Sequence, residues 1–145
     1  MVNYRQWLID DLQLLEQKKF AIIHMASELE TLTDEIGAIK ATSFDKMPSG
    51  NETQEDRLVT ALAKKDELAK NLVATRKHVE DIEALLKQLS DDERRIIDRM
   101  IIHRERNAAD DLAEELGYTN ANIYKLRNKA LRNLAVLRYG VGYRP

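Results

Sequence analysis

The sequence has no cysteine, and among its 145 residues it has only two prolines, five glycines and eight aromatic residues. The lack of cysteine excludes disulfides and thiolate metal sites, and it agrees with a reducing compartment. No apolar run approaches the ~20 residues that a membrane-spanning helix needs. The first residues, Met1 to Trp7, lack the basic and apolar blocks of a signal peptide. We therefore expect a soluble, cytoplasmic protein that does not enter a membrane.

The sequence also lacks the common signatures of catalysis. It contains no glycine-rich phosphate loop, no nucleophile motif and no convergent pair of acids. His24, His78 and His103 are far apart and have no neighbours at ligand spacing. The acidic run at 91–93 is interpreted as the start of a helix rather than as a metal cluster. These absences predict a protein that is not an enzyme and that binds no metal or cofactor.

Charge is plentiful but unevenly distributed along the chain. Residues 1–88 hold 12 Lys and Arg against 16 Asp and Glu, whereas residues 89–145 hold 11 against 9. After Gly117 there is no acidic residue, while six basic residues follow: Lys125, Arg127, Lys129, Arg132, Arg138 and Arg144. A polyanion is the natural partner for such a segment. We expect that only the C-terminal end meets nucleic acid.

The N-terminal third has the pattern of a long coiled-coil helix. From about Tyr4 to Ile39 there is no proline and only one glycine. Apolar residues recur at heptad spacing in two rows, Leu8, Leu15, Ile22, Leu29 and Ile36, and Leu12, Met25, Leu32 and Ile39. We expect one continuous helix of roughly 50 Å, which needs a partner helix to bury its apolar stripe.

The partner helix is predicted immediately downstream. Turn and breaker residues occupy the connector at about 41–53, including Pro48 and Gly50. Helical periodicity resumes from about Thr53 to Leu89 in two rows, Leu58, Leu72, Val79 and Leu86, and Ala61, Leu68, Thr75, Ile82 and Leu89, with Lys65 as a polar exception. Two such helices joined by a short connector predict an antiparallel hairpin over residues 1–89.

The apolar residues outside these rows have two interpretations. Trp7, Phe20 and Ile23 widen the apolar face beyond what one partner helix requires. They favour a homodimer formed through the hairpin. Alternatively, they cap the hairpin or contact the C-terminal module.

A new domain is predicted to begin at Ser90. Ser90-Asp91-Asp92-Glu93 is a capping box, in which Ser90 accepts from the Glu93 amide and the Glu93 carboxylate reaches the Ser90 amide. The helix that follows carries an isoleucine-rich face and should end near 103–106. Asn107 is the expected cap of the next helix, Ala108 to Leu116.

The next stretch has the spacing of a helix-turn-helix. Gly117 occupies the turn, where a positive φ is required, and the small Ala113 allows the two helices to approach closely. Residues expected between the helices are Leu112, Leu116, Tyr118, Ile123 and Leu126. Thr119 is the expected cap of the second helix, on which Ala130 and Leu134 also point inward.

The outward face of that second helix supplies the candidate DNA-binding residues. Asparagine can pair with adenine, lysine can reach guanine or phosphate, and tyrosine can contact a phosphate or a thymine methyl. Basic residues further along the helix are better placed for the phosphate backbone. The predicted set is Thr119, Asn120, Ala121, Tyr124, Lys125, Arg127, Asn128, Lys129 and Arg132.

This module resembles region 4 of bacterial sigma factors over about the last 55 residues. The resemblance is carried by residues 89–97, by 112–119, and by Asn128-Lys129-Ala130-Leu131 with Leu134. Nothing upstream resembles the aromatic-rich region that melts a promoter. Ala108 stands where the sigma pattern usually has a Ser or Thr cap, and Asp110-Asp111 replaces its usual Glu-Ile.

The combination of a sigma-like module with a heptad hairpin, and with Met47-Pro48 and Gly50 in the connector, resembles the RinA/ArpU type of phage late-transcription activator. That family implies binding to double-stranded DNA near a phage promoter, in the nucleoid of a bacterial host. RNA polymerase is then a candidate further partner. A phage terminase small subunit, which binds DNA as an oligomeric ring, is the alternative. A third interpretation is a hairpin that binds another protein beside a merely solvated basic helix.

The sequence thus predicts an all-α protein with three parts. Residues 1–89 form a long antiparallel coiled-coil hairpin that dimerises. Residues 90–139 form a small three-helix helix-turn-helix domain that binds DNA, and residues 140–145 form a basic tail.

Overall fold

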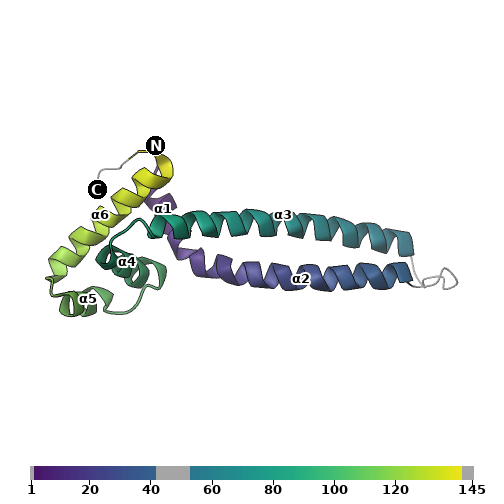
Figure 1. The fold of residues 1–145 in the computed structure, drawn as a ribbon, viewed down its shortest axis with the longest axis horizontal. Helices are drawn as coiled ribbons and strands as arrows, with labels where there is room; N and C mark the ends of the chain where they lie inside the picture. Colours follow the sequence, from purple (N-terminus) through teal and green to yellow (C-terminus); the bar gives the residue numbers. More distant parts are fainter. Residues whose placement is uncertain (1, 42–52, 142–145) are drawn as a thin grey trace. The chain divides into compact units, whose positions relative to one another are not determined.

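The computed structural model describes residues 2–41 and 53–141, and within these ranges every regular element is helical. The elements are α1 (Tyr4–Gln13), α2 (Leu15–Ala41), α3 (Gln54–Leu86), α4 (Asp91–Ile97), the π-helical turn η1 (Asp98–Ile102), α5 (Ala108–Leu116) and α6 (Asn120–Tyr139) (Figure 1). The predicted all-α class is confirmed. Most of the predicted connector and most of the predicted basic tail lie outside the described residues.

The chain divides into two compact units. One unit contains the described residues of 1–17 and 79–145, and the other contains residues 18–78. The expected boundary at residue 90 does coincide with a break between helices, because α3 ends at Leu86 and α4 begins at Asp91. The compact units are divided differently, since α1 and the end of α3 belong with the C-terminal helices.

In the unit of residues 18–78, α2 and α3 lie side by side (Figure 1). Ile36 and Ile39 of α2 pack with Ala61, and Leu58 covers this cluster. Lys64 Nζ lies 3.7 Å from Glu28 Oε1. Later residues of α2 therefore meet earlier residues of α3, which is the order of an antiparallel pair. We call α2 and α3 within this unit the helix pair.

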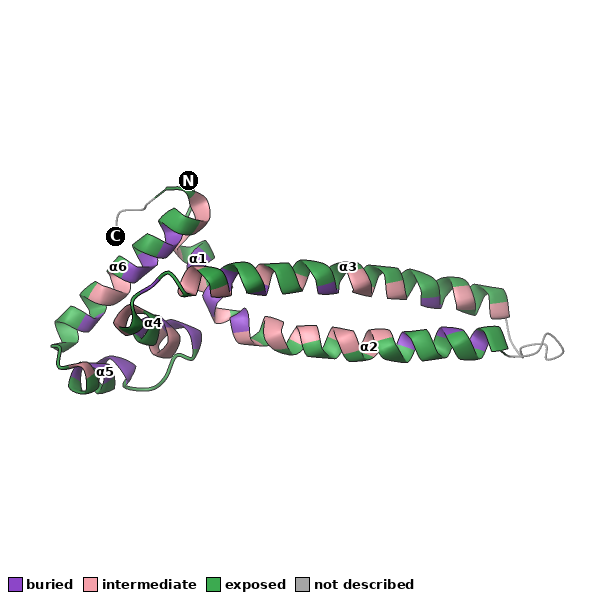
Figure 2. Cartoon of the chain, in the orientation of Figure 1, coloured by how far each residue is buried: buried purple, intermediate pink, exposed green. Residues whose placement is uncertain are grey.

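The heptad rows account for burial along the helix pair. Leu32, Ile36, Ile39, Ala61 and Leu72 are all buried, while most of the remaining surface of both helices is exposed (Figure 2). A repeat of 3.5 residues places these side chains on one stripe of each helix. Burial of that stripe is the main stabilising term for two helices that are otherwise highly charged.

The prediction of one continuous helix from Tyr4 to Ile39 is wrong. α1 ends at Gln13 and α2 begins at Leu15, and between them Leu14 is exposed. The physical reason is the packing of α1 within its own unit, where it contacts α6 and η1. Asp11 Oδ2 lies 3.1 Å from Arg138 Nε, and the Tyr4 and Tyr139 rings lie 5.2 Å apart.

Trp7 takes part in the same contact. Its ring lies 6.1 Å from that of Tyr139 and 5.9 Å from that of Tyr4, each in an edge-on arrangement. Of the two interpretations of Trp7, contact with the C-terminal module therefore holds. Burial against these neighbours also raises the pKa of the Tyr139 phenol.

The helix that begins at Asp91 changes its pitch at Asp98. Ile96, Ile97, Ile101 and Ile102 are all buried, and a spacing of five residues does not return to one face of an α-helix. The turn η1 widens the helix, and the His103 amide donates to the Asp98 carbonyl at 2.9 Å. This i to i−5 bond is the π-helical pattern, which brings both isoleucine pairs toward the interior.

The core beneath the helix-turn-helix joins α4, α5 and α6. It consists of Ile96, Ala108, Ala109, Leu112, Ala113 and Ile123, with Met100, Leu116 and Leu126 packed against it. Small alanines on α5 allow close approach of the neighbouring helices. Further along α6 the buried residues are Ala130, Leu131, Leu134 and Ala135. The predicted inward face of α6 is confirmed.

Candidate nucleic-acid interface

Helix α4 is capped by Ser90, as expected. Ser90 Oγ accepts from the Glu93 amide at 3.2 Å, which satisfies one free donor of the first turn of α4. The return contact differs from the predicted capping box, because the Ser90 hydroxyl donates to Glu93 Oε1 at 2.9 Å. The acidic residues 91–93 lie in the first turn of α4, where the helix dipole favours negative charge.

The turn between α5 and α6 has the predicted left-handed glycine. Gly117 has φ 75° and ψ 26°, and the Tyr118 amide donates to the Ala113 carbonyl at 3.0 Å. This bond satisfies a carbonyl at the end of α5. Thr119 then caps α6, since its Oγ1 accepts from the Asn122 amide at 3.2 Å. Both ends of the turn are thus fixed by capping contacts that the sequence predicts.

The predicted cap at Asn107 is wrong. Asn107 does occupy the position before α5, but its φ is 59° and its side chain makes no capping hydrogen bond. In this left-handed conformation Asn107 contributes to the start of α5 through its backbone carbonyl, which accepts from the Asp111 amide at 3.0 Å. An asparagine tolerates this backbone better than most residues. Its role is therefore to turn the chain into α5.

Tyr118 does not pack between the two helices as predicted. Its side chain is 39% exposed, and its hydroxyl donates to Asp92 Oδ2 at 3.0 Å. This hydrogen bond, with the negative charge of Asp92, raises the pKa of the Tyr118 phenol. The contact joins the turn to the first turn of α4, and Leu116 and Ile123 fill the core without it.

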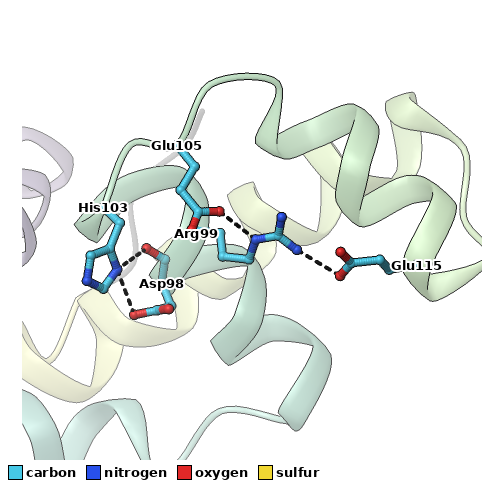
Figure 3. Close-up of polar contacts among 5 residues, drawn as sticks. All are labelled: Asp98, Arg99, His103, Glu105 and Glu115. Carbon is cyan, nitrogen blue, oxygen red and sulfur yellow. Dashed lines mark hydrogen bonds and ion pairs between the residues drawn. The ribbon is translucent and has the colours of Figure 1, made fainter.

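Arg99 forms two ion pairs, one with the loop before α5 and one with the last turn of α5 (Figure 3). Arg99 Nε lies 2.6 Å from Glu105 Oε2, and Arg99 Nη1 lies 2.7 Å from Glu115 Oε2. The hydrogen bond to Glu105 is the largest contribution that raises the pKa of Arg99. One guanidinium therefore connects η1, the loop before α5, and the last turn of α5.

Figure 3 also shows how His103 closes the π-helical turn. Its Nδ1 lies 3.1 Å from the Asp98 carbonyl oxygen and 3.2 Å from Asp98 Oδ1. The sequence predicts neither this contact nor the two ion pairs of Arg99, which we call the Arg99 clamp. Their partners lie five, six and sixteen residues away, so neither has the i, i+3 or i, i+4 spacing that marks a pair on a helix.

The predicted DNA-binding residues lie along the outer side of α6. Most of them are exposed, and only Arg127 and Asn128 are half-buried. The exposed members are Thr119, Asn120, Ala121, Tyr124, Lys125, Lys129 and Arg132. Over the described part of the chain after Gly117, no acidic side chain interrupts this surface. We call these nine residues the α6 face.

Three members of the α6 face contact one another. The Arg127 guanidinium lies over the Tyr124 ring, with Cζ 4.9 Å from the ring centroid. Arg127 Nη2 donates to Asn128 Oδ1 at 3.3 Å. Stacking of this kind reduces the motion of both side chains. Arg127 therefore organises its neighbours in addition to supplying charge, a role that the sequence analysis did not anticipate.

Asn120, the other asparagine of the α6 face, has an acidic partner on α5. Asn120 Nδ2 donates to Oδ1 of Asp110, a residue in the first turn of α5. In the sequence, Asp110 stands out only as a departure from the sigma region 4 pattern. No spacing rule relates residues ten positions apart, so only the folded turn reveals this pair.

Two negative findings apply to the described residues. In residues 2–41 and 53–141, no group of three or more His, Asp or Glu side chains is placed to hold a metal ion. Within the same ranges, no helix has the length and apolar character needed to cross a membrane.

The chain matches no known protein family, no curated protein and no solved structure. The resemblance to sigma region 4 and to activators of the RinA/ArpU type therefore stays a prediction from the residues that carry it.

Proposed function

We propose that this protein binds double-stranded DNA sequence-specifically through the α6 face and regulates transcription of phage or prophage genes. One observation carries the proposal. Helix α6 follows the glycine turn, is capped by Thr119 and has no acidic residue along its own length, and its side chains Asn120, Tyr124 and Lys125 are exposed. A helix of this kind fits the major groove, where its first turns reach base edges. The protein acts as a binding protein in this proposal, and no residue is assigned a catalytic role.

A single helix-turn-helix contacts too few base pairs to select one genomic site. The proposal therefore includes a second anchor, which is a homodimer formed through the helix pair. Large apolar side chains support this part: Phe20, Ile23, Val59 and Val73 are 71%, 68%, 61% and 67% exposed. These side chains offer apolar surface that a second copy of the chain would bury. RNA polymerase on the host nucleoid is the other candidate anchor.

The first test is to map genomic DNA bound by the purified full chain and to measure binding to the enriched site. Tyr124→Ala or Lys125→Ala should each cost ~1–3 kcal/mol on that site, because these exposed side chains are proposed to contact the duplex. Arg132→Ala should mainly flatten the dependence of affinity on salt, since it removes one phosphate contact. If the triple alanine variant of Tyr124, Lys125 and Asn128 binds normally, the α6 face is not the DNA-binding surface.

The alternative function is that of a terminase small subunit, in which the helix pair builds a ring. The exposed apolar residues of the helix pair would serve either assembly. Sedimentation equilibrium of the full chain at micromolar concentration separates the two. A mass of two subunits supports the regulator, and a mass of eight or more supports the packaging ring.

A further inference from the structure

Asp110 is an acidic residue that contacts the α6 face. It lies in the first turn of α5 and is exposed, and its Oδ1 accepts a hydrogen bond from Nδ2 of Asn120. Asn120 is the first residue of α6. The first turn is also the part of such a helix that reaches base edges. A carboxylate here is unexpected, because it repels the phosphates that the rest of the face attracts.

The contact determines which way the amide of Asn120 points. An ionised carboxylate only accepts hydrogen bonds, so the amide nitrogen must face Asp110 and the amide oxygen must face away. The nitrogen carries two N–H groups, and Asp110 takes one of them. One N–H donor and one oxygen acceptor remain on the same planar group for another partner.

This donor and acceptor pair matches one base better than the others. In the major groove adenine presents the N7 acceptor beside the N6 amino donor, whereas guanine presents two acceptors. An amide held in one orientation pairs with adenine through both atoms. With guanine its oxygen would face another oxygen, which is repulsive.

We propose that Asp110 is a positioning residue that fixes the Asn120 amide for adenine at one position of the DNA site. This inference rests on the proposed function, because it assigns a base preference to the same α6 face. Asp110 also lowers affinity for DNA of arbitrary sequence through its charge. Asp110 thus weakens the attraction of the α6 face for phosphates and increases its discrimination between bases.

The chain offers a matched control in the neighbouring residue. Asp111 lies in the same turn of α5 and is also exposed. Asp110→Asn and Asp111→Asn change the net charge equally, so both should raise affinity for random DNA to a similar extent. Only Asp110→Asn changes the group that accepts from Asn120. The new amide can donate as well as accept, so the Asn120 amide is free to turn over.

The experiment selects binding sites for the full chain from a pool of randomised double-stranded DNA. Wild type and Asp111→Asn should enrich one motif with adenine at a defined position. Asn120→Ala identifies that position by losing the preference there alone. Asp110→Asn should reduce the discrimination of adenine against guanine at the same position by about tenfold, with the other positions unchanged.

A second measurement on the free protein tests the geometry without DNA. The two side-chain amide protons of Asn120 should give well-dispersed NMR signals in wild type and in Asp111→Asn. In Asp110→Asn they should move toward the values of an exposed asparagine, while backbone signals show that the fold is retained.

The outcomes distinguish the inference from the proposed function. If wild type enriches a motif but Asp110→Asn and Asp111→Asn select it equally well, the positioning role is wrong and DNA binding stands. The same holds if Asn120→Ala changes no position of the motif. If wild type enriches nothing and fails to bind random duplexes at low salt, the proposed function is wrong, and this inference fails with it.

Discussion

At the scale of single residues, Gly117 shows how one backbone angle sets the geometry of the candidate site. Its φ of 75° is unfavourable for alanine, although a Cβ added there would meet no atom within 4 Å. The cost of Gly117→Ala is therefore backbone strain alone, about 1–2 kcal/mol. We expect this loss in the free energy of unfolding, measured by urea denaturation with far-ultraviolet circular dichroism.

Gly37 is the natural control for this substitution. It lies within α2, and a Cβ added there would also meet nothing within 4 Å. Because alanine favours a helix over glycine, Gly37→Ala should stabilise its unit by up to ~1 kcal/mol. Equal effects of the two substitutions would contradict the assignment of strain to Gly117.

The hydrogen bond from Tyr118 to Asp92 predicts a stability term that depends on pH. Donation favours the neutral phenol, so the pKa of Tyr118 is raised above its ordinary value of 10.0. The stabilisation is complete below that ordinary value and is lost as the pH rises through the raised pKa of the folded state. NMR titration of ¹³C-labelled tyrosine should show that Asp92→Asn lowers the pKa of Tyr118, because the negative charge is removed. Identical titration curves would exclude this coupling.

At the scale of elements, Arg99 adds polar contacts between η1 and both ends of the segment from Glu105 to Glu115. Its guanidinium contacts Glu105 before α5 and Glu115 at the end of α5. Arg99→Ala should therefore increase hydrogen exchange of the backbone amides from 105 to 116. Arg106→Ala removes the same charge from an exposed neighbour and should leave exchange in α5 unchanged. Similar protection in both variants would show that the Arg99 clamp does not hold α5.

The elements show which structural features a sequence can predict. Heptad rows indicate α2 and α3 correctly, and Ser90, Gly117 and Thr119 mark helix ends because capping depends on neighbouring residues. The break at Leu14 has no such signal, since the heptad repeat of Leu8 and Leu15 runs through it. Packing of α1 on α6 determines that break, and a contact between the two ends of the chain has no local signature.

The candidate site also combines features that the sequence predicts with features that it does not. Helical periodicity predicts which side chains of α6 are exposed, and seven of the nine predicted residues are exposed, whereas Arg127 and Asn128 are half-buried. It does not predict the contact of Asp110 with Asn120 or the hydroxyl contact of Tyr118 with Asp92. Both depend on how α4, α5 and α6 approach one another. A helical period indicates which face a residue occupies, whereas its polar partner depends on the tertiary fold.

At the scale of the whole molecule, the segment that the sequence predicts as one helix belongs to two different compact units. α1 packs with the C-terminal helices through Asp11, Tyr4 and Trp7, and α2 from Lys18 onward belongs to the helix pair. Trp7 thus has partners within its own chain. Phe20 and Ile23 stay largely exposed, so the case for a dimer depends on the helix pair alone.

The proposed dimer gives the last prediction. Ile23 and Val73 are largely exposed, and burial of a large apolar side chain contributes about 1.5–3 kcal/mol toward offsetting the cost of association. The double variant Ile23→Lys and Val73→Lys should raise the dimer dissociation constant more than tenfold in sedimentation velocity, because it adds charge at the contact. Val136→Lys changes an exposed apolar residue of the other unit and should leave association unchanged. If the double variant dimerises like wild type, the dimer contact lies outside this part of the helix pair. If the control alone dissociates the dimer, the unit that contains α6 forms the contact.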